Sequence, residues 1–143
     1  MKKTLIVLLV TTVSCTSQES GKTKGKSTSH AQQHTAVTVP LNNGDKWKAD
    51  DATKQNVAVM AQIVNDNNYR GADKRKQLSA ALQSQIDTLV KQCRMKGPEH
   101  DALHVWLENV LKDMKELKKE DDEYKEVYAA LKTDIEAFYA TFE

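Results

Sequence analysis

The stretch CRMKGPEHDALHVW, from Cys93 to Trp106, brings together a cysteine, a methionine and two of the chain's four histidines. Thiolate, imidazole and thioether groups favour Cu(I) or Zn(II) over hard ions. His100 and His104 are four residues apart, a spacing that places two imidazoles on one face of a helix. The pattern predicts a soft-metal site, copper or zinc, with Cys93 and His100 as first ligands and His104 as the next.

The elements that must position these side chains are helices. From Asp50 onward, apolar residues recur at spacings of three and four, which indicates helix to the end of the chain. We expect four amphipathic helices, running approximately over Asp50–Val64, Asp73–Gly97, Pro98–Leu117 and Glu120–Phe142. Short connections between such helices favour an all-α, up-down-up-down four-helix bundle over residues 41–143.

The second and third expected helices meet at Gly97 and Pro98. Gly97 is a candidate left-handed C-terminal cap, and Pro98 suits the first position of a helix, where its missing N–H costs nothing. Cys93 continues the apolar stripe of the second helix and His100 that of the third. We therefore expect both residues, together with His104, at one corner between the two helices.

Two further residues are weaker candidates as metal ligands. Met95 is two positions from Cys93 and would point away from it in a continuous helix. Asp50 begins the first helix, whose start lies at the same end of an up-down bundle.

Other interpretations of the stretch stay open. A non-covalent haem could use His100 or His104 with Met60 or Met95, since no C-x-x-C-H attachment motif occurs. Cys93 could instead be a nucleophile whose histidine base is oriented by neighbouring acids, Glu99 or Asp101. It could also be core filling, because buried cysteine behaves as a small apolar side chain.

The core-filling interpretation makes the domain a structural or protein-interaction module of the cell envelope, with another envelope protein as its partner. We expect no enzyme, because the sequence shows neither an oxyanion loop nor a substrate cleft.

The first residues have the pattern of an export signal. A basic start at Met1–Lys3 precedes the apolar run Leu5–Val13, which is too short to span a bilayer. Cys15 then follows a small residue, as in the bacterial lipobox. We expect residues 1–14 to be a lipoprotein signal peptide and Cys15 to carry the lipid, and the alternative is a plain signal peptide cleaved nearby.

Residues 15–40 are rich in Ser, Thr, Lys and Gly and hold almost no large apolar side chain. Such a composition predicts a disordered tether, in which His30 and His34 are solvated. The folded domain would then be held on the outer membrane through its lipid and would face the periplasm.

Charge and cysteine content exclude some classes. From Pro40 onward the chain has 16 Lys/Arg and 19 Asp/Glu, a net charge of −3, so no basic patch suggests nucleic acid. Once Cys15 is lipidated, Cys93 is the only thiol left. A single thiol in an exported protein pairs between chains, stays reactive or binds a metal.

Two motifs resemble those of a known family. Leu41 to Lys48 reads LNNGDKWK, and Cys93 to Leu107 reads CRMKGPEHDALHVWL. Both resemble motifs of small exported proteins, often lipoproteins, from Gram-negative bacteria of the flavobacterial kind, and the similarity covers Leu41 to Glu143. The family is functionally uncharacterised, so the resemblance implies an exported helical domain and no particular activity.

Overall fold

The computed structural model describes residues 37–119 and 123–143. The expected signal peptide, Cys15, His30, His34 and residues 15–36 of the expected tether lie outside the described residues.

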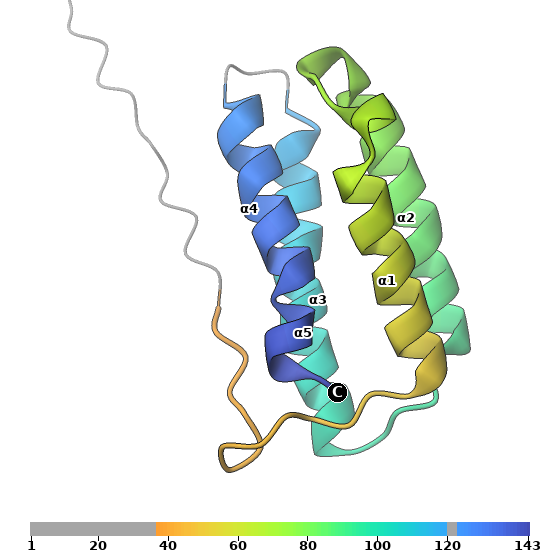
Figure 1. Cartoon of the computed structure of the whole chain (residues 1–143), viewed down its shortest axis with the longest axis vertical. Coiled ribbons are helices and arrows are strands. Elements are labelled where there is room, and N and C mark those ends of the chain that lie inside the picture. Colours follow the sequence, from red (N-terminus) through yellow and green to blue (C-terminus); the bar gives the residue numbers. More distant parts are fainter. Residues whose placement is uncertain (1–36, 120–122) are drawn as a thin grey trace, which may run out of the picture. The chain divides into compact units, whose positions relative to one another are not determined.

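The described chain is all-α, as predicted. Its long helices are α1 (Asp51–Asn65), α2 (Arg75–Gln92), α3 (Pro98–Leu117) and α4 (Tyr124–Glu136) (Figure 1). Two 3-10 turns, η1 (Asn67–Tyr69) and η2 (Ala72–Lys74), connect α1 to α2, and the short helix α5 (Phe138–Thr141) follows α4. Residues 37–119 and 123–143 contain no strand, and none of their helices is long and apolar enough to cross a bilayer.

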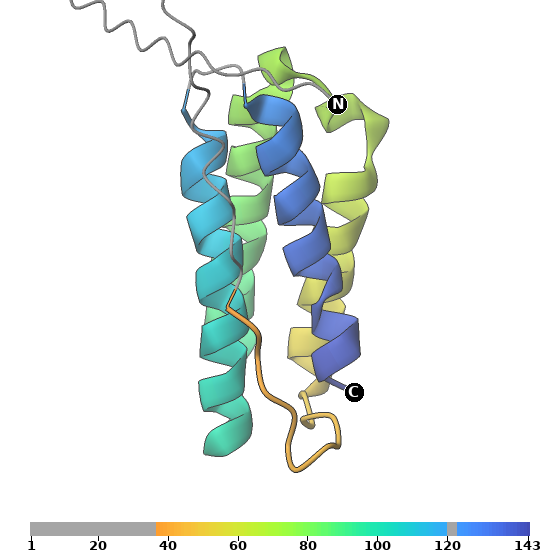
Figure 2. The same cartoon turned by 90° about the vertical axis from the view of Figure 1, so that its left-hand side faces the viewer.

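The long helices pack as two hairpins. α1 lies along α2, and α3 lies along α4. The hairpins meet mainly through α1 and α4, whereas the backbones of α2 and α3 come close at only a few points. Figure 2 shows all four helices running side by side. The open seam between α2 and α3 has room for a surface cleft.

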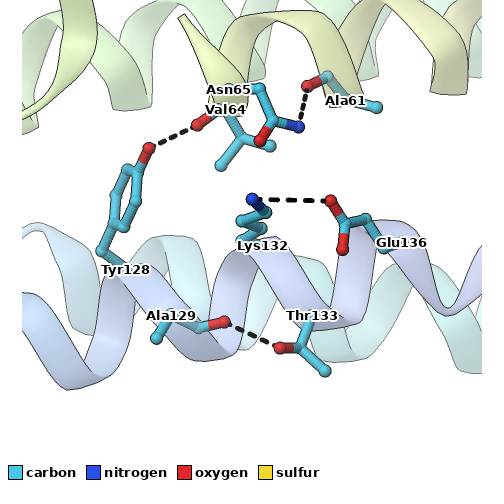
Figure 3. Close-up of polar contacts among 8 residues, drawn as sticks. All are labelled: Ala61, Val64, Asn65, Tyr128, Ala129, Lys132, Thr133 and Glu136. Carbon is cyan, nitrogen blue, oxygen red and sulfur yellow. Dashed lines mark hydrogen bonds and ion pairs between the residues drawn. The ribbon is translucent and has the colours of Figure 1, made fainter. Parts of the chain in front are cut away.

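One hydrogen bond drawn in Figure 3 joins α1 to α4 at the tighter seam, and the other contacts drawn lie within one helix. The Tyr128 hydroxyl of α4 crosses to α1 and donates to the carbonyl oxygen of Val64, near the end of that helix. The last carbonyls of a helix have no partner inside the helix, so this bond satisfies one of them. Lys132 and Glu136 pair along α4, with 3.8 Å between Nζ and Oε1.

Asp50 fixes the start of α1. One of its carboxylate oxygens accepts from the Thr53 N–H at 2.6 Å, as an N-cap residue does. The other accepts from the Arg94 N–H at 2.6 Å, which ties α1 to the link between α2 and α3. Asp50 is therefore the N-cap of α1.

α2 ends earlier than predicted, at Gln92 rather than Gly97. Cys93 leaves the helix with φ −56° and ψ 130°, and the Arg94 N–H turns to Asp50 instead of continuing the helix. Gly97 does have positive φ, 69°, but it is the N-cap of α3, and Pro98 opens that helix as predicted. The interval from Cys93 to Lys96 is therefore a non-helical link.

The fourth expected helix is also interrupted. α4 ends at Glu136, and Phe142 is extended, with φ −122° and ψ 154°. Phe142 forms a parallel bridge with Trp47, in which the Trp47 N–H donates to the Thr141 oxygen and the Glu143 N–H donates to the Trp47 oxygen, both at 2.9 Å. This pairing explains why the helix does not continue to the end of the chain.

The core lies between the four helices and contains the predicted apolar stripes. Trp106 is its largest side chain, 1% exposed, and its indole N–H donates to the Asp134 carbonyl oxygen at 2.7 Å. Its ring meets that of Phe138 edge-on, with centroids 5.2 Å apart. Other side chains buried in this core are Val57, Met60, Val64, Leu78, Leu82, Ile86, Leu89, Leu103, Val110, Met114, Leu117, Leu131 and Ile135.

Residues 37–40, at the end of the expected tether, pack against the helices. The Val37 N–H donates to Asn109 Oδ1 at 3.1 Å, and Asn109 Nδ2 donates to the Val37 oxygen at 2.8 Å. The Trp47 indole N–H donates to the Pro40 oxygen at 2.7 Å. We call residues 37–40 the N-terminal strap, since they cross α3 before the chain reaches α1.

Candidate metal centre

A cleft of about 250 Å³ opens between the end of α2 and the start of α3. Its floor is apolar and its rim carries the thiol and imidazole groups; the lining residues are Leu89, Val90, Cys93, His100, Leu103, His104 and Leu107. The structure thus places Cys93, His100 and His104 on one cleft.

The two imidazoles are in direct contact. His100 Nε2 and His104 Nε2 are 3.0 Å apart, and the ring centroids are 4.6 Å apart. His100 is half-buried and His104 is exposed. At this distance one ring carries its proton on Nε2 and donates it to the Nε2 lone pair of the other. Two nitrogens on adjacent turns of one helix therefore already face the same point.

This spacing suits two ligands of one metal ion. Metal–nitrogen bonds of about 2.0–2.1 Å to atoms 3.0 Å apart enclose an angle of about 91–97°. That angle is narrower than the tetrahedral angle of a zinc site, and a small rotation of either ring opens it towards that angle. Binding requires only that the donor ring moves its proton from Nε2 to Nδ1.

Cys93 is less closely placed. Its thiol is free and half-buried, and its N–H still donates to the Leu89 oxygen at 2.8 Å, so it stays at the last turn of α2. Across the described ranges 37–119 and 123–143, no three His, Cys, Asp or Glu side chains are close enough together to hold a metal ion. The structure therefore joins the imidazoles and leaves the thiol on the opposite wall of the cleft.

The two weaker candidates have structural contacts. Met95 is only 8% exposed and packs in the core rather than lining the cleft. Both Asp50 oxygens accept backbone N–H groups, from Thr53 and Arg94. Burial alone would raise the pKa of Asp50, but the hydrogen bonds from Arg94 and Thr53 hold it below its ordinary value.

Among the described residues, no carboxylate is hydrogen-bonded to either imidazole in a way that would orient it as a catalytic base. Within the part of the chain that the structure describes, neither His100 nor His104 accepts or donates a hydrogen bond to Glu99 or Asp101. Each Nε2 faces the other ring instead. This arrangement suits metal binding better than general-base catalysis.

A second pair of like side chains was not predicted from the sequence. Asp113 of α3 and Asp134 of α4 are 1% and 9% exposed and lie near enough for the Asp134 charge to act on the Asp113 carboxyl. Burial and the neighbouring charge of Asp134 raise the pKa of Asp113 to about 7. The signal was present, because Asp113 stands three residues after Val110 and four before Leu117, on the inner stripe of its helix.

Comparison with known proteins adds no family: no family model matches the chain, and neither the curated proteins nor the solved structures gave a match. The resemblance of the motifs around Trp47 and Cys93 to exported flavobacterial proteins stays a prediction.

Proposed function

We propose that this chain is a lipid-anchored envelope protein that binds a soft transition metal, copper or zinc, at the α2–α3 cleft. Its up-down-up-down bundle would be held on the outer membrane by lipid on Cys15 and would face the periplasm. His100 and His104 would be the first ligands, and a change of rotamer would bring the Cys93 thiolate across the cleft as the third. We assign no catalytic residue.

One observation carries the proposal: the Nε2 atoms of His100 and His104 are 3.0 Å apart on the rim of a cleft that Cys93 also lines. Neutral imidazole and thiolate are the donors that copper and zinc prefer. A site with three protein ligands keeps a fourth position for solvent or a partner, and the exposed edge of His104 leaves that position open.

The test is metal binding by protein purified without a histidine tag. Equilibrium dialysis against Zn(II), and anaerobically against Cu(I), should give one tightly bound ion per chain. His100→Ala and His104→Ala should each weaken binding by more than about tenfold, because even second-shell changes cost about 10–100-fold. Cys93→Ser should weaken Cu(I) binding more than Zn(II) binding, because thiolate is the softest of the three donors.

The expected tether offers a matched control. His30 and His34 have the same four-residue spacing as His100 and His104. A His30→Ala/His34→Ala variant should keep full affinity if the metal binds at the cleft. Loss of binding in this variant, with binding retained in His100→Ala, would place the metal on the tether and overturn the proposal.

A second candidate function is a protein-interaction module without metal. Val90 on the cleft is 61% exposed, and Leu111 further along α3 is 39% exposed. Exposed apolar side chains beside an apolar cleft are features of protein-binding surfaces. If neither metal binds and Val90→Lys abolishes association with an envelope protein, this candidate replaces the metal site.

The described residues suit haem less well than they suit a single metal ion. Met60, one of its expected axial ligands, is completely buried in the core between the helices. The cleft volume of about 250 Å³ is also below the roughly 300–1,000 Å³ of pockets that hold drug-sized ligands.

A further inference from the structure

A cavity opens where the turn before α2 meets the start of α4. Its volume of about 790 Å³ lies within the roughly 300–1,000 Å³ of pockets that hold drug-sized ligands. Figure 1 shows the starts of α2 and α4 at one end of the helices and the α2–α3 link, beside the metal cleft, at the other. The lining residues of the cavity are Arg70, Gly71, Ala72, Arg75, Tyr124, Lys125, Glu126 and Tyr128.

Positive charge predominates around this cavity. Arg70, Arg75 and Lys125 line it, and Glu126 is the one acid among the lining residues. Arg70 and Lys125 are exposed, and neither forms an ion pair within residues 37–119 and 123–143. α4 begins here, and the N–H groups of a first helical turn have no carbonyl partners within the helix, which adds partial positive charge. The cavity therefore attracts an anion.

Arg75 is the half-buried cation of the cavity, and three contacts hold its guanidinium in place. Its Nε donates to the Ala72 oxygen at 2.9 Å, and its Nη1 donates to the Lys119 oxygen. Its Cζ is 5.6 Å from the centroid of the Tyr124 ring, a cation–π contact. A guanidinium has five N–H donors, so the two backbone bonds leave donors for a ligand. A planar fork of this kind matches the two oxygens of a carboxylate.

Two tyrosine rings give the cavity an apolar wall. Tyr124 and Tyr128 are half-buried, with ring centroids 5.7 Å apart and planes tilted by 32°. The Tyr128 hydroxyl donates to the Val64 oxygen, and the Tyr124 hydroxyl donates to the Tyr69 oxygen at 3.4 Å. These bonds hold both rings before a ligand arrives, which lowers the entropy cost of binding. Aromatic side chains pack well against other flat rings, so this wall favours a ligand that contains one.

We propose that this cavity binds a small aromatic carboxylate. The carboxylate of the ligand accepts hydrogen bonds from the Arg75 guanidinium, and its ring packs against Tyr124 and Tyr128. Arg70 and Lys125 attract the anion from the edge of the cavity. The 18 residues of α2, about 27 Å at 1.5 Å per residue, separate this site from the metal cleft. The proposal therefore does not depend on metal binding.

Isothermal titration calorimetry of the metal-free full chain with 2-naphthoate tests the proposal. One molecule should bind per chain. Naphthalene-2-carboxamide keeps the ring without the charge, and acetate keeps the carboxylate without the ring. Each should bind at least about tenfold more weakly, because it loses either the charge-assisted hydrogen bonds or the aromatic contact.

Variants locate the site. Arg75→Lys should weaken 2-naphthoate binding by about tenfold or more, because an ammonium group is a point charge without the planar fork. Arg70→Gln should weaken it by about two- to threefold, because an exposed charge is largely screened. Lys91→Gln removes the same charge from an exposed position near the far end of α2 and should leave the affinity unchanged.

Equal affinity for 2-naphthoate and its carboxamide would overturn the proposal, as would acetate binding as tightly as 2-naphthoate. Equal weakening by Arg70→Gln and Lys91→Gln would also refute it, because only net charge would then matter. If Arg75→Lys does not fold, NMR of the wild-type tyrosine rings decides the matter. The Tyr124 and Tyr128 signals must shift along the same saturation curve as the heat, and shifts confined to residues of the α2–α3 cleft would contradict the proposal.

Discussion

Two pairs of like side chains face each other in this protein, and both include residues of α3. His100 and His104 lie at the open start of the helix, on the rim of the α2–α3 cleft. Asp113 lies deeper, facing Asp134 of α4 where the helices pack closely. The first pair is open to solvent, whereas the second is almost completely buried.

The two pairs differ in exposure, and exposure decides which cation each pair of side chains can bind. A metal ion needs an entry path and an unfilled coordination position, and His104 of the first pair is exposed. A proton needs no cavity to hold it. Two buried carboxyl groups that face each other favour a proton on one of them. The open seam between α2 and α3 thus favours a metal, and the closed seam between α3 and α4 favours a proton.

The largest expected effect comes from Trp106, which lies on α3 between the two pairs. Trp106→Ala should lower the free energy of unfolding by about 3–5 kcal/mol, because it removes a buried ring and the hydrogen bond to the Asp134 oxygen. His104→Ala, two residues away but exposed, should change it by less than about 0.5 kcal/mol. Urea denaturation of both variants measures the contrast, and equal losses would contradict the division into buried and open halves.

The next effect is the pH dependence of stability from the acidic pair. The pKa of Asp113 is raised to about 7, so the native state keeps a proton that the unfolded state has released. The stabilisation is complete below about pH 4 and is lost as pH rises towards about 7, at up to about 1.4 kcal/mol per pH unit. Denaturation at a series of pH values should show a flatter profile for Asp113→Asn, and identical profiles would disprove the role of the pair.

A smaller effect distinguishes the structural role of Asp50 at the start of α1 from a role as a metal ligand. Asp50→Ala should cost about 1–2 kcal/mol of stability, because the start of α1 and the Arg94 N–H both lose their acceptor. Metal affinity should stay within about twofold of wild type, measured by the dialysis that tests the cleft. Asp50→Asn keeps one acceptor oxygen and should recover part of the stability. A loss of metal affinity with unchanged stability would instead make Asp50 a ligand.

The sequence predicted the helices and the placement of His100 and His104 where α2 and α3 meet, because both follow from local patterns. Spacings of three and four gave α1, α2 and α3 and most of α4, and the Gly97–Pro98 pair correctly marked the start of α3. The His100–His104 contact follows directly from the i, i+4 spacing.

What the sequence could not give depends on distant contacts. α2 ends at Gln92 partly because Asp50, far away in the chain, takes the Arg94 N–H. Phe142 leaves its helix in order to pair with Trp47. The separation of Cys93 from the imidazoles has the same origin, since a non-helical link replaces the expected last turn of the second helix.

The central claim is that the two facing Nε2 atoms bind a metal, and nitrogen NMR of the imidazole rings tests it most directly. With one equivalent of Zn(II) added to protein that carries His30→Ala and His34→Ala, the Nε2 signals of His100 and His104 should move together, and both rings should become protonated at Nδ1. The shift should reverse on acidification, because protons compete for the ligand nitrogens. If neither Nε2 signal moves at one equivalent of Zn(II) or Cu(I), the pair is not a metal centre, and the cleft is left as an interaction surface.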